Sequence, residues 1–175
     1  LANNNFHGEL SSKWGSFEEL GTLLISHNNI TGRIPPELGD SIMLHKIDLS
    51  FNQLVGNIPK ELGNLKSLVQ LDLSNNQLYG PIPKELGLLK NLLRVDLSAN
   101  QLSGLIPESL VNCEPLIYMN LSNNDLNQAI PLQILKLNHL SQLDLSRNLL
   151  VGEISPQFRG LESLEILNLS HNHLF

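Results

Sequence analysis

Residues 71–92 form the stretch LDLSNNQLYGPIPKELGLLKNL, which combines two structural signals. Leu71 and Leu73 alternate with Asp72, and this period of two predicts a short strand with one buried face. Gly80 and Pro83 predict a change of direction, since glycine permits tight backbone and proline fixes φ. The segment that follows is expected to return with inward-pointing leucines, namely Leu86, Leu89 and Leu92.

The same frame recurs along the whole chain at a constant interval of 24 residues. Asparagine occupies the position of Asn76 in every copy, and serine stands two residues before it in seven of them. A coil of this length cannot bury its own apolar side chains, so neighbouring coils must stack into one continuous core. We expect an α/β repeat fold: a right-handed leucine-rich repeat solenoid of 24-residue coils, with a parallel sheet on its concave face.

The recurring asparagine is expected to have a structural role. It follows the strand at the point where the chain turns, and its side chain can hydrogen-bond backbone groups of the turn. Because identical turns are stacked one coil apart, these side chains are predicted to form a ladder along the solenoid. The ladder comprises Asn28, Asn52, Asn76, Asn100, Asn124, Asn148 and Asn172.

The stretch 71–92 resembles the plant-specific class of leucine-rich repeats, in which LxGxIP follows the asparagine. The resemblance implies a second, short strand on the flank of each coil, at Leu78–Ile82 and its equivalents. It also implies a long array closed by cysteine-bearing caps, as in ectodomains of plant receptor-like kinases and receptor-like proteins. Residues 1–175 are accordingly expected to be a single array of about seven coils, an uncapped fragment of a longer ectodomain.

A narrower resemblance, to one receptor-kinase subgroup, rests on residues 3–20 (NNNFHGELSSKWGSFEEL), 116–131 (LIYMNLSNNDLNQAIP) and 152–164 (GEISPQFRGLESL). Members of that subgroup perceive secreted serine-rich peptides in immune and growth signalling. The resemblance implies a place on the extracellular face of the plasma membrane or in the apoplast. It also implies a secreted peptide or protein ligand and a co-receptor ectodomain as partners. Any kinase would lie outside this chain, which contains no kinase motif.

Composition excludes several other classes of protein. The chain has 11 Lys+Arg against 17 Asp+Glu, and this net charge of −6 argues against nucleic-acid binding. No apolar run reaches the ~18 residues that cross a bilayer. Cys113 is the single cysteine, which excludes an internal disulfide and a multi-cysteine zinc site, and the six histidines lack metal-ligand spacing. An open concave face also lacks the desolvated cleft that acid–base catalysis needs. We expect no enzyme activity, no metal and no cofactor.

The candidate ligand-binding residues lie on the expected concave face, in two outward columns that flank the buried strand residue of each coil. The first column varies between coils, whereas the second is mostly aspartate, which the family consensus LDLS also explains. Aspartates about 4.8 Å apart repel one another, so a cation beside them stabilises the row. An aromatic residue at the turn adds an exposed anchor. The candidate set is Lys46, Asp48, Phe51, Gln70, Asp72, Arg94, Asp96 and Tyr118.

Three glycosylation sequons occur, at Asn29, Asn120 and Asn168. The last two arise whenever asparagine replaces aspartate in LDLS, so the motif is weak by itself. Glycans at Asn120 and Asn168 are expected to cover the C-terminal part of the concave sheet.

Three functions remain open at this point. The chain is either the ligand-recognition segment of a receptor-like kinase or part of a secreted, non-kinase protein that binds a folded partner such as a cell-wall hydrolase. A third possibility is a scaffold segment that only spaces other parts of a receptor. The sequence that follows Phe175 distinguishes them: a cysteine cap followed by an apolar span of about 20 residues and a kinase indicates the first function, whereas a stop after the cap favours the second.

Overall fold

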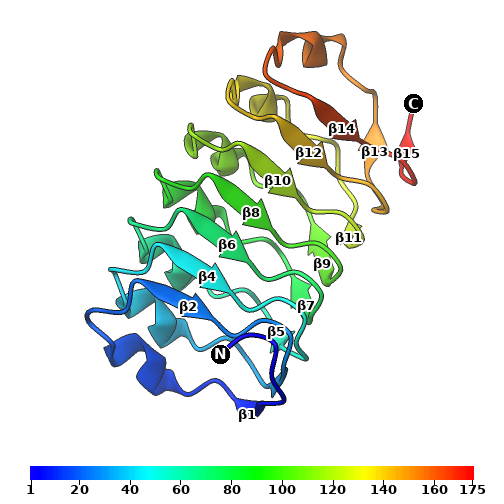
Figure 1. Ribbon diagram of the computed structural model, residues 1–175. Helices are drawn as coiled ribbons and strands as arrows, with labels where there is room; N and C mark the ends of the chain where they lie inside the picture. The colour runs from blue at the N-terminus through cyan, green and yellow to red at the C-terminus, as the bar shows by residue number, and fades with distance from the viewer.

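The computed structural model describes residues 1–175 as a stack of coils (Figure 1). Each coil contributes one three-residue strand to a seven-stranded parallel sheet, in which paired residues are 24 positions apart, as the period predicts. Side chains between the two outward columns of this sheet point into the core. From the N-terminal end, the sheet contains β2 (Thr22–Leu24), β4 (Lys46–Asp48), β6 (Gln70–Asp72), β8 (Arg94–Asp96), β10 (Tyr118–Asn120), β12 (Gln142–Asp144) and β14 (Ile166–Asn168).

The return legs contain short 3-10 helices that pack against one another from coil to coil. Their approach is close: a Cβ on Gly63 would overlap the carbonyl oxygen of Glu85 in the next coil, so only glycine fits there. The helices are η1 (Ser12–Ser16), η2 (Pro36–Asp40), η3 (Lys60–Asn64), η4 (Lys84–Leu88), η5 (Glu108–Asn112), η6 (Leu132–Lys136) and η7 (Pro156–Gly160).

The flank of the solenoid carries a second set of short parallel strands. The expected strand at Leu78–Ile82 instead spans Gln77–Gly80, and it ends before Pro81, which has no N–H to donate to a neighbour. Two-stranded pairs lie at the two ends of the array, and a four-stranded sheet lies between them. The flank strands are β1 (His7–Glu9), β3 (Asn29–Thr31), β5 (Val55–Gly56), β7 (Gln77–Gly80), β9 (Gln101–Gly104), β11 (Asp125–Leu126), β13 (Val151–Gly152) and β15 (His173–Leu174).

One hydrophobic core of 36 buried residues runs through the stack. Cys113 belongs to it and occupies the position that leucine fills in other coils. Burial decreases toward the C-terminal end, where Ile154 is 43% exposed although its equivalent Ile82 is 3% exposed. The central coils are therefore the best-packed part of the array.

The frame asparagines join each coil to the one before it. The Nδ2 of Asn76 donates to the carbonyl oxygens of Leu49, Leu73 and Ser74 at 3.0–3.1 Å, and its Oδ1 accepts from the backbone N–H of Leu54 at 3.0 Å. The same four contacts recur at equivalent positions along the stack, for example around Asn100 and Asn124. Each side chain thus satisfies buried backbone groups of two coils at once.

Candidate ligand-binding face

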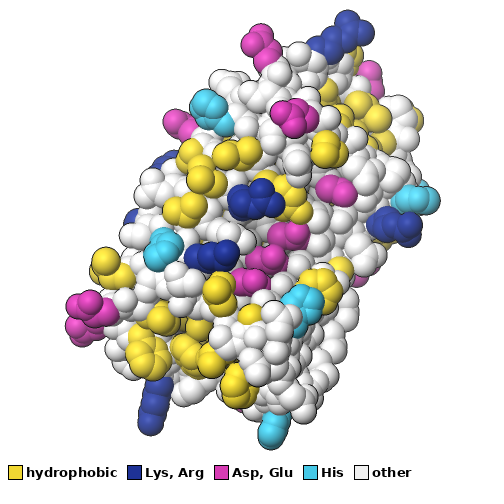
Figure 2. Space-filling model, viewed as in Figure 1, with side chains coloured by type: hydrophobic (Ala, Val, Ile, Leu, Met, Phe, Trp, Pro, Cys, Tyr) yellow, Lys and Arg dark blue, Asp and Glu magenta, His cyan; other side chains and the backbone are white.

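The sheet formed by β2 to β14 brings most of the candidate residues onto adjacent strands. Lys46, Gln70, Arg94 and Tyr118 are register neighbours in the first outward column. In the second column, Asp48, Asp72, Asp96 and Asn120 are neighbours in the same way. Figure 2 shows acidic side chains gathered over the middle of this face, with basic side chains beside them. The face therefore presents both signs of charge within a few strands.

Each aspartate of the central row is held by a local hydrogen-bond pattern. The Oδ1 of Asp72 accepts from the backbone N–H of Ser74 at 3.0 Å and from its hydroxyl at 2.7 Å. Asp48 and Asp96 make the same pair of bonds to the serine two residues later. The motif LDLS thus fixes one oxygen of each carboxylate and leaves the second oxygen to be satisfied from a neighbouring coil.

The second oxygens differ, and Asp72 is the exception. The Oδ2 of Asp48 accepts from the hydroxyl of Ser26 at 3.0 Å, while the Oδ2 of Asp96 accepts from Tyr118 at 2.9 Å and from Asn120 at 3.2 Å. The Oδ2 of Asp72 accepts no hydrogen bond from the protein, because both its neighbours in the row are also acids. Asp72 is thus the carboxylate of this row with an unused acceptor.

The environment of Asp72 also disfavours the charged form of its carboxyl. Burial raises the pKa of this carboxyl above its ordinary value, and the negative charges of Asp96 and Asp48 raise it further, while the bonds from Ser74 partly oppose both effects. A cation or hydrogen-bond donor placed at the free oxygen would relieve this unfavourable setting.

Arg94 and Tyr118 form a second feature of the face. The guanidinium carbon of Arg94 lies 4.1 Å from the centre of the Tyr118 ring, a cation–π contact. Burial raises the pKa of the Tyr118 hydroxyl, and the nearby negative charge of Asp96, whose Oδ2 this hydroxyl donates to, raises it further. Stacking fixes the plane of the Arg94 side chain, which remains exposed to solvent. Between these groups lies a cavity of about 40 Å³, lined by Gln70, Leu71, Asp72, Arg94, Asp96 and Tyr118.

Phe51 lies at the turn after β4, away from the two columns. It is 46% exposed, and its ring stacks on that of His27 with centroids 4.2 Å apart and planes 10° apart. Both residues have positive φ, +52° and +54°, a conformation that is unusual for a bulky side chain. The stacked pair was not apparent from sequence, although the two residues are 24 positions apart and the period could have suggested it.

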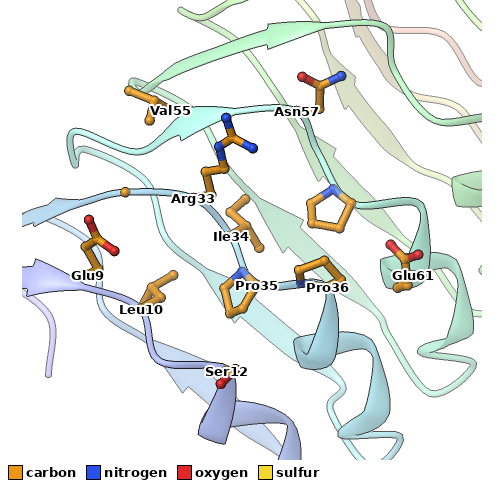
Figure 3. Close-up of a pocket in the computed structure, with 12 residues that line it drawn as sticks. Glu9, Leu10, Ser12, Arg33, Ile34, Pro35, Pro36, Val55, Asn57 and Glu61 are labelled. Carbon is orange, nitrogen blue, oxygen red and sulfur yellow. The ribbon is translucent and has the colours of Figure 1, made fainter.

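A larger hollow of about 700 Å³ lies on the flank of the N-terminal coils (Figure 3). Sequence reasoning did not indicate it. Glu9 and Leu10 line it from the first coil, Arg33 projects from the next, and Glu61 stands across from them (Figure 3). The aliphatic part of Arg33 lies against Gly56, and the hollow is open to solvent, with apolar side chains among its charged ones.

The three sequon asparagines occupy two kinds of environment. Asn29 is exposed on β3 of the flank, whereas Asn120 and Asn168 are half-buried on the concave sheet.

None of the 3-10 helices could span a membrane. Nor does any group of three His, Cys, Asp or Glu side chains converge as a metal site would require.

Comparison with known proteins identifies the family. The Leucine Rich Repeat family model matches residues 19–41, 43–65, 67–89, 91–113 and 139–161. The chain therefore belongs to the leucine-rich repeat family. No curated protein sequence matches the chain.

Solved structures of plant receptor ectodomains share this fold. The ectodomain of the membrane receptor kinase GASSHO1/SCHENGEN3 from Arabidopsis thaliana, solved in complex with CASPARIAN STRIP INTEGRITY FACTOR 2, is 38% identical with a TM-score of 0.97, over 99% of this chain and 21% of that one. The Arabidopsis receptor kinase HAESA, in complex with the peptide hormone IDA and the co-receptor SERK1, is 36% identical with a TM-score of 0.95, over 98% of this chain and 29% of that one.

The fold also occurs in a plant protein of another kind. A plant ice-binding protein is 27% identical with a TM-score of 0.81, over 99% of this chain and 64% of that one. The chain thus spans less than a third of the two receptor ectodomains and less than two thirds of the ice-binding protein. Because one fold supports different functions, the function must be argued from the side chains of the face.

Proposed function

We propose that the chain is a ligand-recognition segment of a plant leucine-rich repeat receptor kinase, outside the plasma membrane, and that it binds a secreted peptide on its concave face. The observation that carries the proposal is the free Oδ2 of Asp72, next to an exposed Arg94 that stacks on Tyr118. The HAESA complex supports the choice of a peptide and of a co-receptor ectodomain as a second partner. The chain itself is non-catalytic in this proposal.

The chemistry of the face indicates what such a peptide must offer. Asp72 needs a donor, either an ammonium or guanidinium group or a hydroxyl. Arg94, whose face is covered by Tyr118, keeps its N–H edges for a carboxylate or a backbone carbonyl of the ligand. Phe51 and His27 offer a flat aromatic surface at the turn side of the sheet.

The dimensions of the face suit an extended peptide. Seven strands about 4.8 Å apart span roughly 29 Å, and an extended peptide rises about 3.3 Å per residue. The face therefore accommodates about nine residues running across the strands. A serine-rich peptide supplies hydroxyl donors at many positions, and this agrees with the subgroup that residues 3–20, 116–131 and 152–164 resemble. Immune or developmental signalling would be the corresponding context.

The test is a binding screen with a defined probe. Positional-scanning nonapeptide libraries, with Ser, Lys, Arg, Asp or Phe fixed at each position in turn, are incubated with the immobilised chain, and the bound peptides are sequenced. We expect enrichment of peptides that the Arg94→Glu variant does not retain. A control variant, Glu108→Lys, changes the charge at the start of η5 on the return leg and should enrich the same peptides.

Two results would contradict the proposal. Enriched peptides that bind both variants equally well would place the site away from the concave face. Recovery of no peptide, together with tight binding of a folded cell-wall hydrolase, would favour the secreted, non-kinase alternative.

A further inference from the structure

The three sequons differ in what the amide nitrogen of the asparagine does in the folded chain. N-glycosylation joins this nitrogen, Nδ2, to a sugar, so its environment decides which site is compatible with the native sheet. The difference bears on the proposed function because two of the sequons lie on the concave face itself.

Asn29 has an unobstructed amide nitrogen. It is exposed on β3, and its Oδ1, not its Nδ2, takes part in a hydrogen bond, which comes from Nε2 of Gln53. A glycan on Nδ2 leaves this bond intact. The hydroxyl of Thr31 in the same sequon donates to the carbonyl of Gly8 on the neighbouring strand β1, also on the flank.

Asn120 is fully engaged. Its Nδ2 donates to Oδ2 of Asp96 at 3.2 Å and to the hydroxyl of Tyr118 at 3.3 Å. Its Oδ1 accepts from the N–H of Ser122 at 3.1 Å and from the hydroxyl of Ser122 at 2.7 Å. Both polar atoms of the side chain, and the hydroxyl of the sequon serine, are therefore already paired within the concave sheet.

Asn168 repeats part of this arrangement one strand beyond Asp144, with one donor contact instead of two. Its Nδ2 donates to Oδ2 of Asp144 at 3.1 Å, and its Oδ1 accepts from the N–H and the hydroxyl of Ser170 at 3.3 and 2.9 Å. Like Asn120, it stands in a row of register neighbours, where lateral spacing is about 4.8 Å. A sugar on either nitrogen would stand within this row, beside the hydrogen that the asparagine donates to the aspartate of the preceding coil.

We propose that Asn29 carries an N-linked oligosaccharide in the secreted protein, whereas Asn120 and Asn168 do not, so that the concave face stays uncovered along its length. In N-glycosylation a bond forms between Nδ2 of the asparagine and C1 of the sugar. The bond from C1 to the diphosphate of a lipid-linked oligosaccharide donor breaks, and the amide loses one proton. The one remaining amide hydrogen at Asn120 cannot keep both contacts that the free Nδ2 makes. At Asn168 it must keep the bond to Asp144 while a sugar stands on the same nitrogen, inside the sheet.

The inference rests on the proposed function in one respect, since it requires passage through the secretory pathway. It changes the expectation, stated above from sequence, that glycans at Asn120 and Asn168 cover the C-terminal part of the sheet. A glycan on the flank instead leaves the proposed peptide site accessible from solvent.

For the test, the chain is expressed in plant cells with a heterologous signal peptide, which directs it into the secretory pathway. The occupancy of each sequon is then measured by mass spectrometry of tryptic peptides and of the intact protein. We expect Asn29 to be occupied in most molecules and Asn120 and Asn168 in few. The Thr31→Ala variant removes this sequon while keeping the asparagine, and it should lose the mass of one glycan. Ser122→Ala and Ser170→Ala, which remove the other two, should leave the intact mass unchanged apart from the substitution.

Substantial occupancy of Asn120 or Asn168, or an unmodified Asn29 in the secreted chain, would overturn the inference. The signal peptide guarantees entry into the secretory pathway, so these outcomes do not depend on the proposed function. The proposed function is tested separately: it fails if antibodies against the native protein locate it on the cytoplasmic side of the plasma membrane.

Discussion

Asp72 and Asp96 are register neighbours on β6 and β8 with the same bonds to their own serines, yet only Asp96 has its second oxygen satisfied within the protein. The difference arises one strand further on, because Tyr118 and Asn120 donate to Asp96 while no donor reaches Asp72. Asp72 is thus less well satisfied in the free protein than its neighbour. Groups that bind ligands are often less than optimal for stability.

The first prediction is that Asp72→Asn stabilises the protein and weakens peptide binding. Asn120 and Asn168 demonstrate how an amide fits this row: Oδ1 accepts from the serine two residues later, and Nδ2 donates to the aspartate of the preceding coil. An amide at position 72 would donate to Asp48 in the same way. One added hydrogen bond and one fewer like charge should raise the free energy of unfolding by about 1 kcal/mol at pH 7, measured by urea titration.

The stability gain should depend on pH with a defined sign. The pKa of Asp72 is raised in the folded state, so the folded protein binds more protons than the unfolded chain between the two pKa values. The cost of the charged Asp72 is therefore absent at low pH and present above its folded pKa. The difference in unfolding free energy between Asp72→Asn and the natural chain should shrink as the pH falls through the raised folded pKa of Asp72, and it should stop changing below the ordinary carboxyl pKa of about 4. A constant difference across the pH range would contradict this account.

The asparagine ladder supplies a second prediction. Asn100→Ala removes three donor contacts to the carbonyls of Leu73, Leu97 and Ser98 and the acceptor for the N–H of Leu78. Leaving these backbone groups unpaired should cost about 1–3 kcal/mol of unfolding free energy. Gln101→Ala, at an exposed position one residue later, should cost less than about 0.5 kcal/mol. Equal costs in a denaturant titration would contradict a structural role for the ladder.

The buried thiol gives a third prediction. Cys113 is fully buried, its Sγ lies 3.4 Å from the carbonyl oxygen of Leu86, and burial raises its pKa to about 11. At pH 8 the thiol should stay protonated, and the folded protein should react with iodoacetamide at least a hundred times more slowly than the urea-unfolded chain. Comparable rates, followed by mass spectrometry, would mean that this coil opens readily.

Unequal burial along the stack predicts that backbone amides are unequally protected from hydrogen exchange. In the 175-residue chain, Leu1 and Phe175 are 63% and 83% exposed, whereas Leu97 and Leu102 around Asn100 are buried. Amide hydrogens of β1 and β15 should therefore exchange fastest, and those of β6 and β8 slowest. Exposed apolar ends and unpaired parallel edges should also promote self-association as concentration rises. Uniform protection of all coils in a monomer would contradict both expectations.

Much of the fold could be predicted from the sequence because the 24-residue frame repeats the same local chemistry. The register of the concave sheet, the inward leucines and the position of Cys113 all follow from it. The end of the flank strand at Gly80 could not be predicted, because the resemblance indicates that a strand exists but not where its hydrogen bonding to the neighbouring strand stops. The exposure of Ile154 depends on how much of the following coil packs against it, which the sequence of its own coil does not describe.

The candidate face was predictable as a set of outward positions but not in its pairings. Ser26 can donate to Asp48 because Leu24 occupies the aspartate position of its own coil, and this leaves the hydroxyl without a local carboxylate. Arg94 lies beside Asp72 and Asp96, and the sequence did not indicate that its guanidinium also stacks on the Tyr118 ring. These pairings depend on which hydrogen-bond donors of two neighbouring coils have no partner within their own coil. Only the assembled sheet therefore reveals that the second oxygen of Asp72 has no donor.

The last prediction concerns charge on the binding face. Arg94→Glu removes the cation that stacks on Tyr118 and places a third acid beside Asp72 and Asp96. It should therefore weaken binding of a nonapeptide enriched in the library screen at least about tenfold, or about 1.4 kcal/mol. Glu108→Lys, at an exposed position of η5, should change the affinity less than about twofold. Isothermal titration calorimetry at two salt concentrations separates a direct contact from long-range attraction, because salt weakens the long-range attraction much more. If Arg94→Glu leaves the affinity unchanged while Glu108→Lys abolishes binding, the ligand does not bind to the concave face.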